Sequence, residues 1–122
     1  MGARALTAYG LGRLAFGAAG LVAPAAVGEA LVGEGAREGA ARILMGNFAT
    51  RDVLLGLGVL HAARGGGGED VRRWLVAGTA SDVLDALVQL REWRDLPPDR
   101  RVAGVAFSAV AAAGGAMLLL RG

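Results

Sequence analysis

Several chemically useful side chains are missing or scarce in this chain. It has no cysteine and no lysine, a single histidine (His61), and aromatic residues make up only 5% of it. Without cysteine there are no disulfides, thiolate metal ligands or cysteine nucleophiles. One histidine cannot supply a histidine cluster with metal-ligand spacing. We therefore expect no metal site and no cofactor of the nucleotide, metal or redox type.

Polar residues are also scarce for a soluble domain. Hydrophobic residues make up 54% of the 122 residues, and the mean hydropathy is +0.47. The length is that of one domain, and the composition indicates an integral membrane protein. Thirteen arginines face eleven acidic residues, a net charge of only +2. No basic block is interleaved with aromatics, so we expect no nucleic-acid partner.

Four apolar segments are each about as long as a membrane-spanning helix. They cover residues 5–27, 43–63, 74–90 and 102–120, and the intervening segments hold most of the charges and helix breakers. Short connections favour antiparallel neighbours. The sequence thus predicts an all-α fold, a single integral membrane domain built as an antiparallel bundle of four transmembrane helices.

A soluble four-helix bundle is the alternative, since 20% of the residues are charged. Each helix of such a bundle needs a charged outer stripe. Residues 102–120 contain no charge at all, which favours the membrane interpretation. Five arginines flank the predicted spans on one side and six on the other, so the orientation stays open.

Polar residues fall on one face of each of the first three segments. Helical spacing aligns Asp82, Asp85 and Gln89 in the third segment. It aligns Asn47, Arg51 and His61 in the second, with Asp52 pointing away from them, and Tyr9 with Arg13 in the first. A charge at the centre of a bilayer costs roughly 2.5–3.5 kcal/mol on insertion scales, so these faces should converge.

The charges on these faces should pair with one another. We predict that Arg51 binds Asp82 or Asp85, because a guanidinium can hold a carboxylate through two hydrogen bonds. Asp82 and Asp85 lie one helical turn apart. With too few cations beside them, one of the two should hold a proton near neutral pH.

Three motifs carry a family resemblance. They are GRLAFG at residues 12–17, NFATRDVLLGLG at residues 47–58 and SDVLDAL at residues 81–87. With them the chain resembles a family of small bacterial four-helix integral membrane proteins known only as a domain of unknown function. The resemblance implies a four-span bundle in the bacterial cytoplasmic membrane and directs attention to Arg51, Asp52, Asp82 and Asp85. It implies no activity.

The leading hypothesis from the sequence is a small membrane enzyme. Its catalytic residues would be Asp82, Asp85, Arg51 and Asp52, performing acid-base chemistry such as isomerisation, cyclisation or epoxide opening on a lipophilic substrate. The other polar residues on the converging faces would bind the substrate: Asn47, His61, Gln89, Tyr9 and Arg13.

Two alternatives stay open. The carboxylates could carry protons or cations in a transporter or channel subunit, which four helices could form only as a homo-oligomer. They could also serve a structural membrane subunit, as polar links between helices. In each case the lipid bilayer is a partner. For the enzyme, a lipophilic small molecule is a second partner.

Overall fold

Helices make up the fold. The structure is a computed structural model that describes residues 2–65 and 67–121, and no strand occurs in these ranges, so the all-α prediction is confirmed. Its elements are α1 (Ala3–Val22), α2 (Pro24–Val32), the 3-10 turn η1 (Glu34–Arg37), α3 (Gly39–Gly65), α4 (Gly68–Arg91), the 3-10 turn η2 (Trp93–Asp95) and α5 (Arg101–Arg121).

The segment expected as one helix over residues 5–27 is divided in two. Ala23 leaves the helical conformation, with φ −132° and ψ 63°, and Pro24 begins α2. Proline has no backbone N–H and its ring displaces the preceding turn, so it ends one helix and starts the next well. The chain turns here, and α2 occupies part of the segment expected as a connection.

The other long helices extend past the expected spans. α3 begins at Gly39 and α4 at Gly68, four and six residues before the apolar segments that they contain. Hydropathy marks where a chain becomes apolar, whereas a helix continues into polar residues that favour it. The sequence GGGG at residues 65–68 predicts a flexible turn, and Gly66 within it lies outside the described residues.

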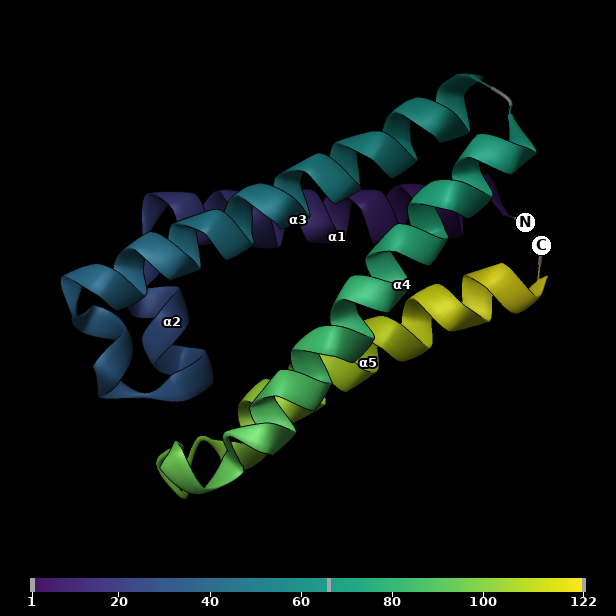
Figure 1. The fold of residues 1–122 in the computed structure, drawn as a ribbon. Coiled ribbons are helices and arrows are strands. Elements are labelled where there is room, and N and C mark those ends of the chain that lie inside the picture. The colour runs from purple at the N-terminus through teal and green to yellow at the C-terminus, as the bar shows by residue number, and fades with distance from the viewer. Residues whose placement is uncertain (1, 66, 122) are drawn as a thin grey trace.

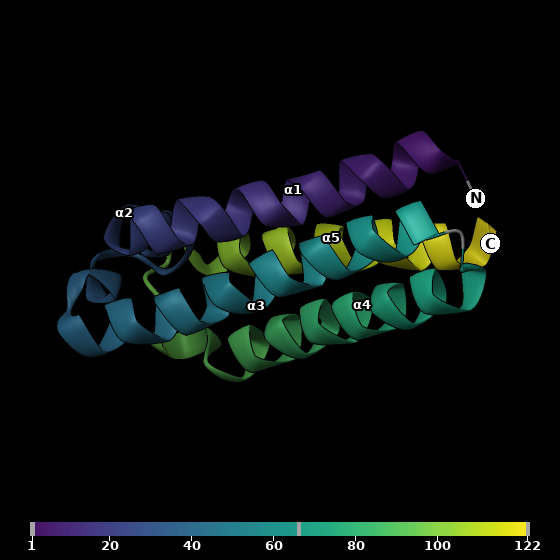
Figure 2. The same cartoon turned by 90° about the horizontal axis from the view of Figure 1, so that it is seen from above.

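The four long helices form two arms. α1 lies beside α3 in one arm and α4 beside α5 in the other, and the arms diverge from the end where both termini lie (Figure 1). Seen from above, successive long helices run in opposite directions (Figure 2). At the open end, α2 contacts α5, and Arg100 Nε donates a hydrogen bond to the backbone oxygen of Glu29 at 3.1 Å. α2 thus links the arms where they are farthest apart.

Glycines bring α1 and α3 close together. A Cβ atom added at Gly17 would lie 2.6 Å from the backbone oxygen of Ala49, and one at Gly56 would lie 2.7 Å from the backbone oxygen of Gly10. Side chains could not fit at either position without moving a backbone. Such close contacts between small residues are a usual way for helices to associate in membranes.

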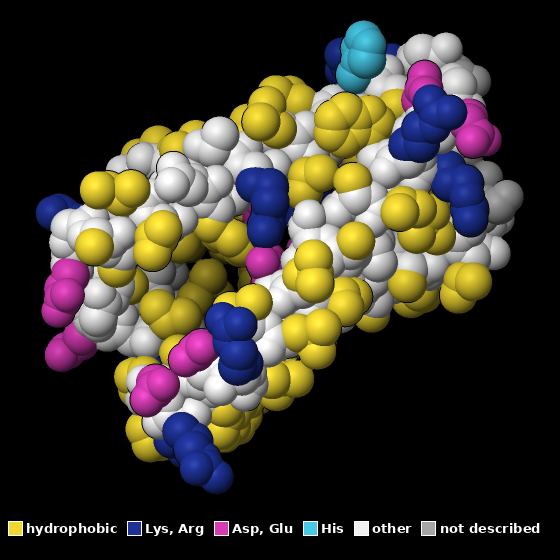
Figure 3. All heavy atoms as spheres, in the orientation of Figure 1, with side chains coloured by type: hydrophobic (Ala, Val, Ile, Leu, Met, Phe, Trp, Pro, Cys, Tyr) yellow, Lys and Arg dark blue, Asp and Glu magenta, His cyan; other side chains and the backbone are white. Residues whose placement is uncertain are grey.

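Large apolar side chains remain exposed around the bundle. They include Ile43, Leu84 and Val110, which are 66%, 60% and 72% exposed. Hydrophobic side chains cover much of the face in Figure 3, including the walls of the hollow between the arms. Among the described residues, α1, α3 and α5 are long and apolar enough to cross a membrane. α4 carries too many charges to be counted with them.

The α1–α3 contact can be tested with Gly17→Ala. Overpacking a close contact costs typically about 1–3 kcal/mol, so we expect the free energy of unfolding to fall by that amount. The measurement is thermal unfolding in mild detergent. Gly12→Ala on the same helix is the control, because a Cβ there meets nothing within 4 Å. Equal unfolding temperatures for the two variants would contradict the close contact.

Candidate functional site

Arg13 lies at the centre of the polar site. It stands near the middle of α1, and its side chain is only 7% exposed. Helical spacing places Tyr9 four residues before it and Phe16 three residues after it, on the same side of the helix. α1 therefore presents an arginine between two aromatic rings to the interior of the bundle.

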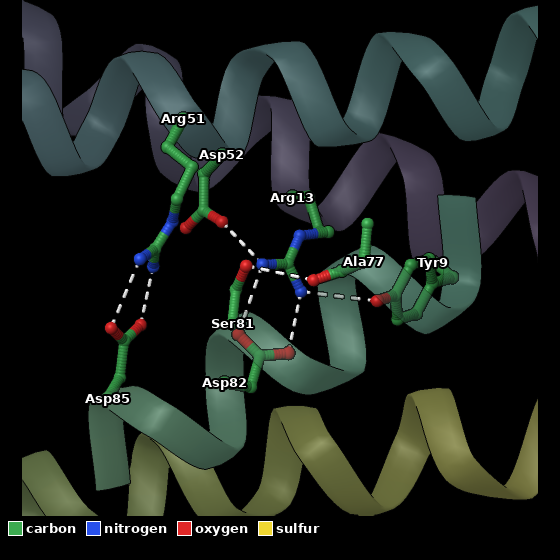
Figure 4. A network of polar contacts seen from close by, with 8 residues as sticks. All are labelled: Tyr9, Arg13, Arg51, Asp52, Ala77, Ser81, Asp82 and Asp85. Carbon is green, nitrogen blue, oxygen red and sulfur yellow. Dashed lines mark hydrogen bonds and ion pairs between the residues drawn. The ribbon is translucent and has the colours of Figure 1, made fainter. Parts of the chain in front are cut away.

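The guanidinium of Arg13 binds two buried carboxylates from different helices. Its Nη1 and Nη2 atoms donate hydrogen bonds to Oδ2 and Oδ1 of Asp82 on α4, at 2.7 and 3.0 Å (Figure 4). Nη2 also donates to Oδ1 of Asp52 on α3, at 2.6 Å. The predicted convergence of charges from the first three long helices is thus confirmed. With both carboxylates ionised, the three side chains carry one net negative charge.

Tyr9 completes this group. Its hydroxyl oxygen accepts a hydrogen bond from Nη1 of Arg13 at 3.2 Å. Because the oxygen acts as acceptor here, the hydroxyl proton can be donated elsewhere. Tyr9 therefore offers a donor at the edge of an otherwise internally paired cluster.

A second ion pair lies beside the first. Nη1 and Nη2 of Arg51 donate to Oδ1 and Oδ2 of Asp85 at 3.1 and 2.5 Å. The predicted pairing of Arg51 with Asp82 or Asp85, the two aspartates of the D-x-x-D motif at residues 82–85, is confirmed, and Asp85 is the partner. These side chains are 35% and 18% exposed, so this pair is more open than the Arg13 group. The guanidinium also stands 4.6 Å from the centre of the Phe48 ring.

The expectation that Asp82 and Asp85 compete for too few cations is wrong. Each has its own arginine, Arg13 for Asp82 and Arg51 for Asp85. Arg13 comes from α1, and the spacing of residues within one helix could not reveal a partner on another helix. An imbalance remains, because these two arginines face three aspartates. The surplus carboxylate belongs to the Arg13 group, which includes Asp52.

A partly open pocket of about 300 Å³ adjoins the Arg13 group between α1 and α5. Its walls are mostly apolar, whereas its polar part consists of Tyr9, Arg13, Asp52 and Asp82. The remaining lining residues are Ala8, Gly12 and Phe16 of α1 with Phe107, Ala111 and Gly114 of α5. The volume lies at the lower end of the range for small-molecule sites.

The structure separates the expected site residues. Tyr9, Arg13, Asp52 and Asp82 line the pocket, while Arg51 and Asp85 form the neighbouring pair outside its lining. The other three expected binding residues do not line it: Asn47 and His61 are exposed on α3, and Gln89 packs near Gly104 of α5.

Sequence reasoning missed the wall on α5. Phe107, Ala111 and Gly114 follow one another at helical spacing, which is a detectable signal for one face of a helix. No polar residue marks that face, since Ser108 is buried elsewhere on the helix. The wall could be recognised only once the partner of α5 across the pocket was known.

No protein-family model, no curated protein and no solved structure matches this chain. The resemblance to the uncharacterised bacterial membrane family therefore stays a prediction. What the site defines by itself is a buried arginine–aspartate cluster beside an apolar pocket.

Removal of Arg13 tests the role of this cluster in stability. Arg13→Gln leaves two buried carboxylates without their cation, and breaking a buried pair in this way costs about 3–5 kcal/mol. Arg51→Gln should cost less, because its pair is more exposed. Thermal unfolding in detergent measures both.

A combined variant separates lost pairing from lost packing. Arg13→Met together with Asp52→Leu and Asp82→Leu leaves no unpaired charge at the site, so it should unfold at a higher temperature than Arg13→Met alone. Equal unfolding temperatures for Arg13→Gln and Arg51→Gln would contradict the central position of Arg13.

Proposed function

We propose that this protein is a small enzyme of the cytoplasmic membrane, with four transmembrane helices, that performs acid-base chemistry on a lipophilic substrate. The observation that carries the proposal is the pocket between α1 and α5, whose apolar walls end at two carboxylates bound to one guanidinium. An apolar cavity selects a lipophilic molecule, and the carboxylates provide a proton donor beside a proton acceptor.

The placement of charge along the helices supports four spans. α4 has 24 residues, a length of about 36 Å, which exceeds the roughly 30 Å of a bilayer core. Its two central aspartates are paired inside, while Val83, Leu84 and Leu87 are exposed. Arg13, Asp52 and Asp82 all lie near the middle of their helices, at the same depth, where unpaired charge would be most costly.

An apolar depression adjoins the pocket at the side of the bundle. Phe107 and Ala111 line both the pocket and a shallow apolar depression on α5, which continues along Ala103, Ala106 and Val110. The depression contains almost no polar surface. A substrate dissolved in the bilayer would therefore reach the carboxylates without passing through water.

The chemistry follows from the charge imbalance. One proton on either Asp52 or Asp82 neutralises the Arg13 group. The protonated carboxyl donates its proton to the substrate, and the ionised carboxyl accepts a proton from another substrate carbon or from an attacking water. Arg13 holds both carboxyls in place and stabilises the negative charge that the donor acquires. The pair at the pocket is thus Asp52 with Asp82, and Arg51–Asp85 links α3 to α4 beside the pocket.

Isotope incorporation tests this function before the substrate is known. Hydrophobic molecules retained during gentle purification are identified by mass spectrometry and incubated with the protein in D₂O. The wild type should introduce deuterium at carbon. Asp52→Asn and Asp82→Asn should each slow incorporation by about 10²- to 10⁴-fold, the usual contribution of acid-base catalysis.

Asp85→Asn is the matched control, since it removes a carboxylate of the same helix that does not line the pocket. It should retain most of the incorporation rate. Wild-type rates in both Asp52→Asn and Asp82→Asn would exclude the mechanism.

A purely structural role is the second candidate, favoured by the pairing of all three aspartates with arginines. Filling the pocket distinguishes the two. Gly114 lines the pocket, and a Cβ there meets nothing within 4 Å, so this position has room for a larger side chain that occupies pocket volume. Gly114→Leu should stay folded and lose the retained molecule and the deuterium incorporation.

Gly46→Leu is its control. Gly46 is equally half-buried in a helix and also has open space at its Cβ, but it lies outside the pocket lining. It should keep both properties. If Gly114→Leu retains the molecule as the control does, the pocket is not the binding site and the structural role is favoured.

A further inference from the structure

Aromatic side chains are concentrated around this one pocket. The chain has three Phe, two Trp and one Tyr. Half of them, Tyr9, Phe16 and Phe107, are among the ten residues that line the pocket. Aliphatic residues far outnumber aromatic ones in this sequence and would make an apolar wall equally well. The pocket is therefore distinguished by aromatic side chains as well as by its low polarity.

The rings are held in place. Phe16 of α1 and Phe107 of α5 lie with their centres 4.6 Å apart and their planes at 36°. Phe48 of α3 packs edge-on against Phe16, at 5.8 Å and 86°. Contacts with two rings thus fix Phe16, whereas Phe107 is 40% exposed.

We infer that the pocket stabilises a positive charge on carbon, so that the substrate is a branched alkene, or the epoxide of one, that becomes a tertiary carbocation on protonation. This inference rests on the proposed acid-base function. Aromatic faces attract cations, most strongly where water is excluded. Once its proton has left, the Arg13 group carries one net negative charge, because two carboxylates outweigh one guanidinium. The cation would lie between that charge and the rings.

The lining offers little to a more polar substrate. Apart from Tyr9, Arg13, Asp52 and Asp82, the lining residues have only hydrogen, methyl or benzyl side chains. Both terminal nitrogens of Arg13 already donate to carboxylates. A polyhydroxylated or charged molecule would lose hydrogen bonds to water and find few replacements.

The reaction balances without a co-reactant. The protonated carboxyl transfers its proton to an alkene carbon, the π electron pair forms the new C–H bond, and the neighbouring carbon becomes cationic. The ionised carboxylate then removes a proton from a carbon beside the cation, and that C–H electron pair forms the isomeric double bond. With an epoxide, the proton goes to oxygen, the C–O bond breaks onto oxygen, and the same deprotonation gives an allylic alcohol.

A lipophilic amine tests this inference, because its ammonium group imitates the cation. N,N-dimethyloctylamine is compared with 2-methyldecane, which has a carbon in place of the nitrogen. Dissociation constants come from thermal shifts of the full chain in detergent, each corrected by the shift of Gly114→Leu, whose pocket is filled. We expect the amine to bind at least about tenfold more tightly than the hydrocarbon.

Phe107→Leu keeps an apolar side chain and removes the π face. It should weaken amine binding about 3- to 30-fold, the range of a cation–π contact, with hydrocarbon binding unchanged within about twofold. Trp93→Leu is the control, because it removes an aromatic ring that does not line the pocket. It should change neither constant.

Equal binding of amine and hydrocarbon, or equal weakening of both by Phe107→Leu, would overturn the inference. The deuterium measurement separates this failure from that of the enzyme. Deuterium incorporation without amine selectivity leaves the acid-base function standing and removes the carbocation. Amine selectivity with neither deuterium incorporation nor formation of an allylic alcohol overturns the enzyme, and the substrate assignment with it. An alkene isomer with deuterium at carbon indicates an alkene substrate, and an allylic alcohol without deuterium at carbon indicates an epoxide.

Discussion

The paired guanidinium of Arg13 is the constraint on which the rest of the structure depends. A charged side chain at the middle of an apolar helix is costly unless it is paired, and each of its carboxylate partners is subject to the same cost. Arg13 removes this cost for itself and for both partners, because it binds Asp82 through two hydrogen bonds and Asp52 through a third. These bonds fix how α1, α3 and α4 are rotated and how far each is shifted along its axis.

Close packing holds α1 against α3, whereas ion pairs hold α4 to both of them. Glycines bring α1 against α3 until backbones touch, so this arm needs no polar link along most of its length. The arm of α4 and α5 diverges from it and shares fewer contacts with it (Figure 1). Arg13–Asp82 and Arg51–Asp85 cross this gap. Because the arms are braced by side chains rather than by close helix contact, space remains between α1 and α5 for a pocket.

Hydropathy and helical spacing were sufficient for the helices and for part of the site. They predicted apolar segments inside α1, α3, α4 and α5 and the bond between Arg51 and the D-x-x-D motif. They could not predict the partner of Asp52. That residue is rotated about 100° from Arg51 on the same helix, and periodicity says only that it points elsewhere. Arg13 receives it because α1 packs on that side of α3, which depends on glycine contacts distant in sequence.

The turn at Ala23 and the pocket wall on α5 could not be predicted from the sequence, for a similar reason. Pro24 marks a break, but the direction of α2 depends on its contacts with α5, and only after α2 does the positive φ of 91° at Gly33 turn the chain toward η1. Phe107 and Gly114 become pocket residues only because α1 and α5 stay apart. Properties of one helix can be inferred from its own residues, whereas a cavity is a property of two.

The charge count bears on whether the cluster is only structural. Hydrophobic residues often stabilise a buried site as well as an ion pair does, so a buried salt bridge is weak evidence for a stabilising role. A structural link between α1 and α4 needs only Arg13 and Asp82. Asp52 adds a second carboxylate to a cation that is already paired, which leaves a buried surplus of negative charge unless a proton is bound. A surplus carboxylate that one exchangeable proton would neutralise, placed beside an apolar pocket, is what acid-base chemistry requires, and a purely structural link gains nothing from it.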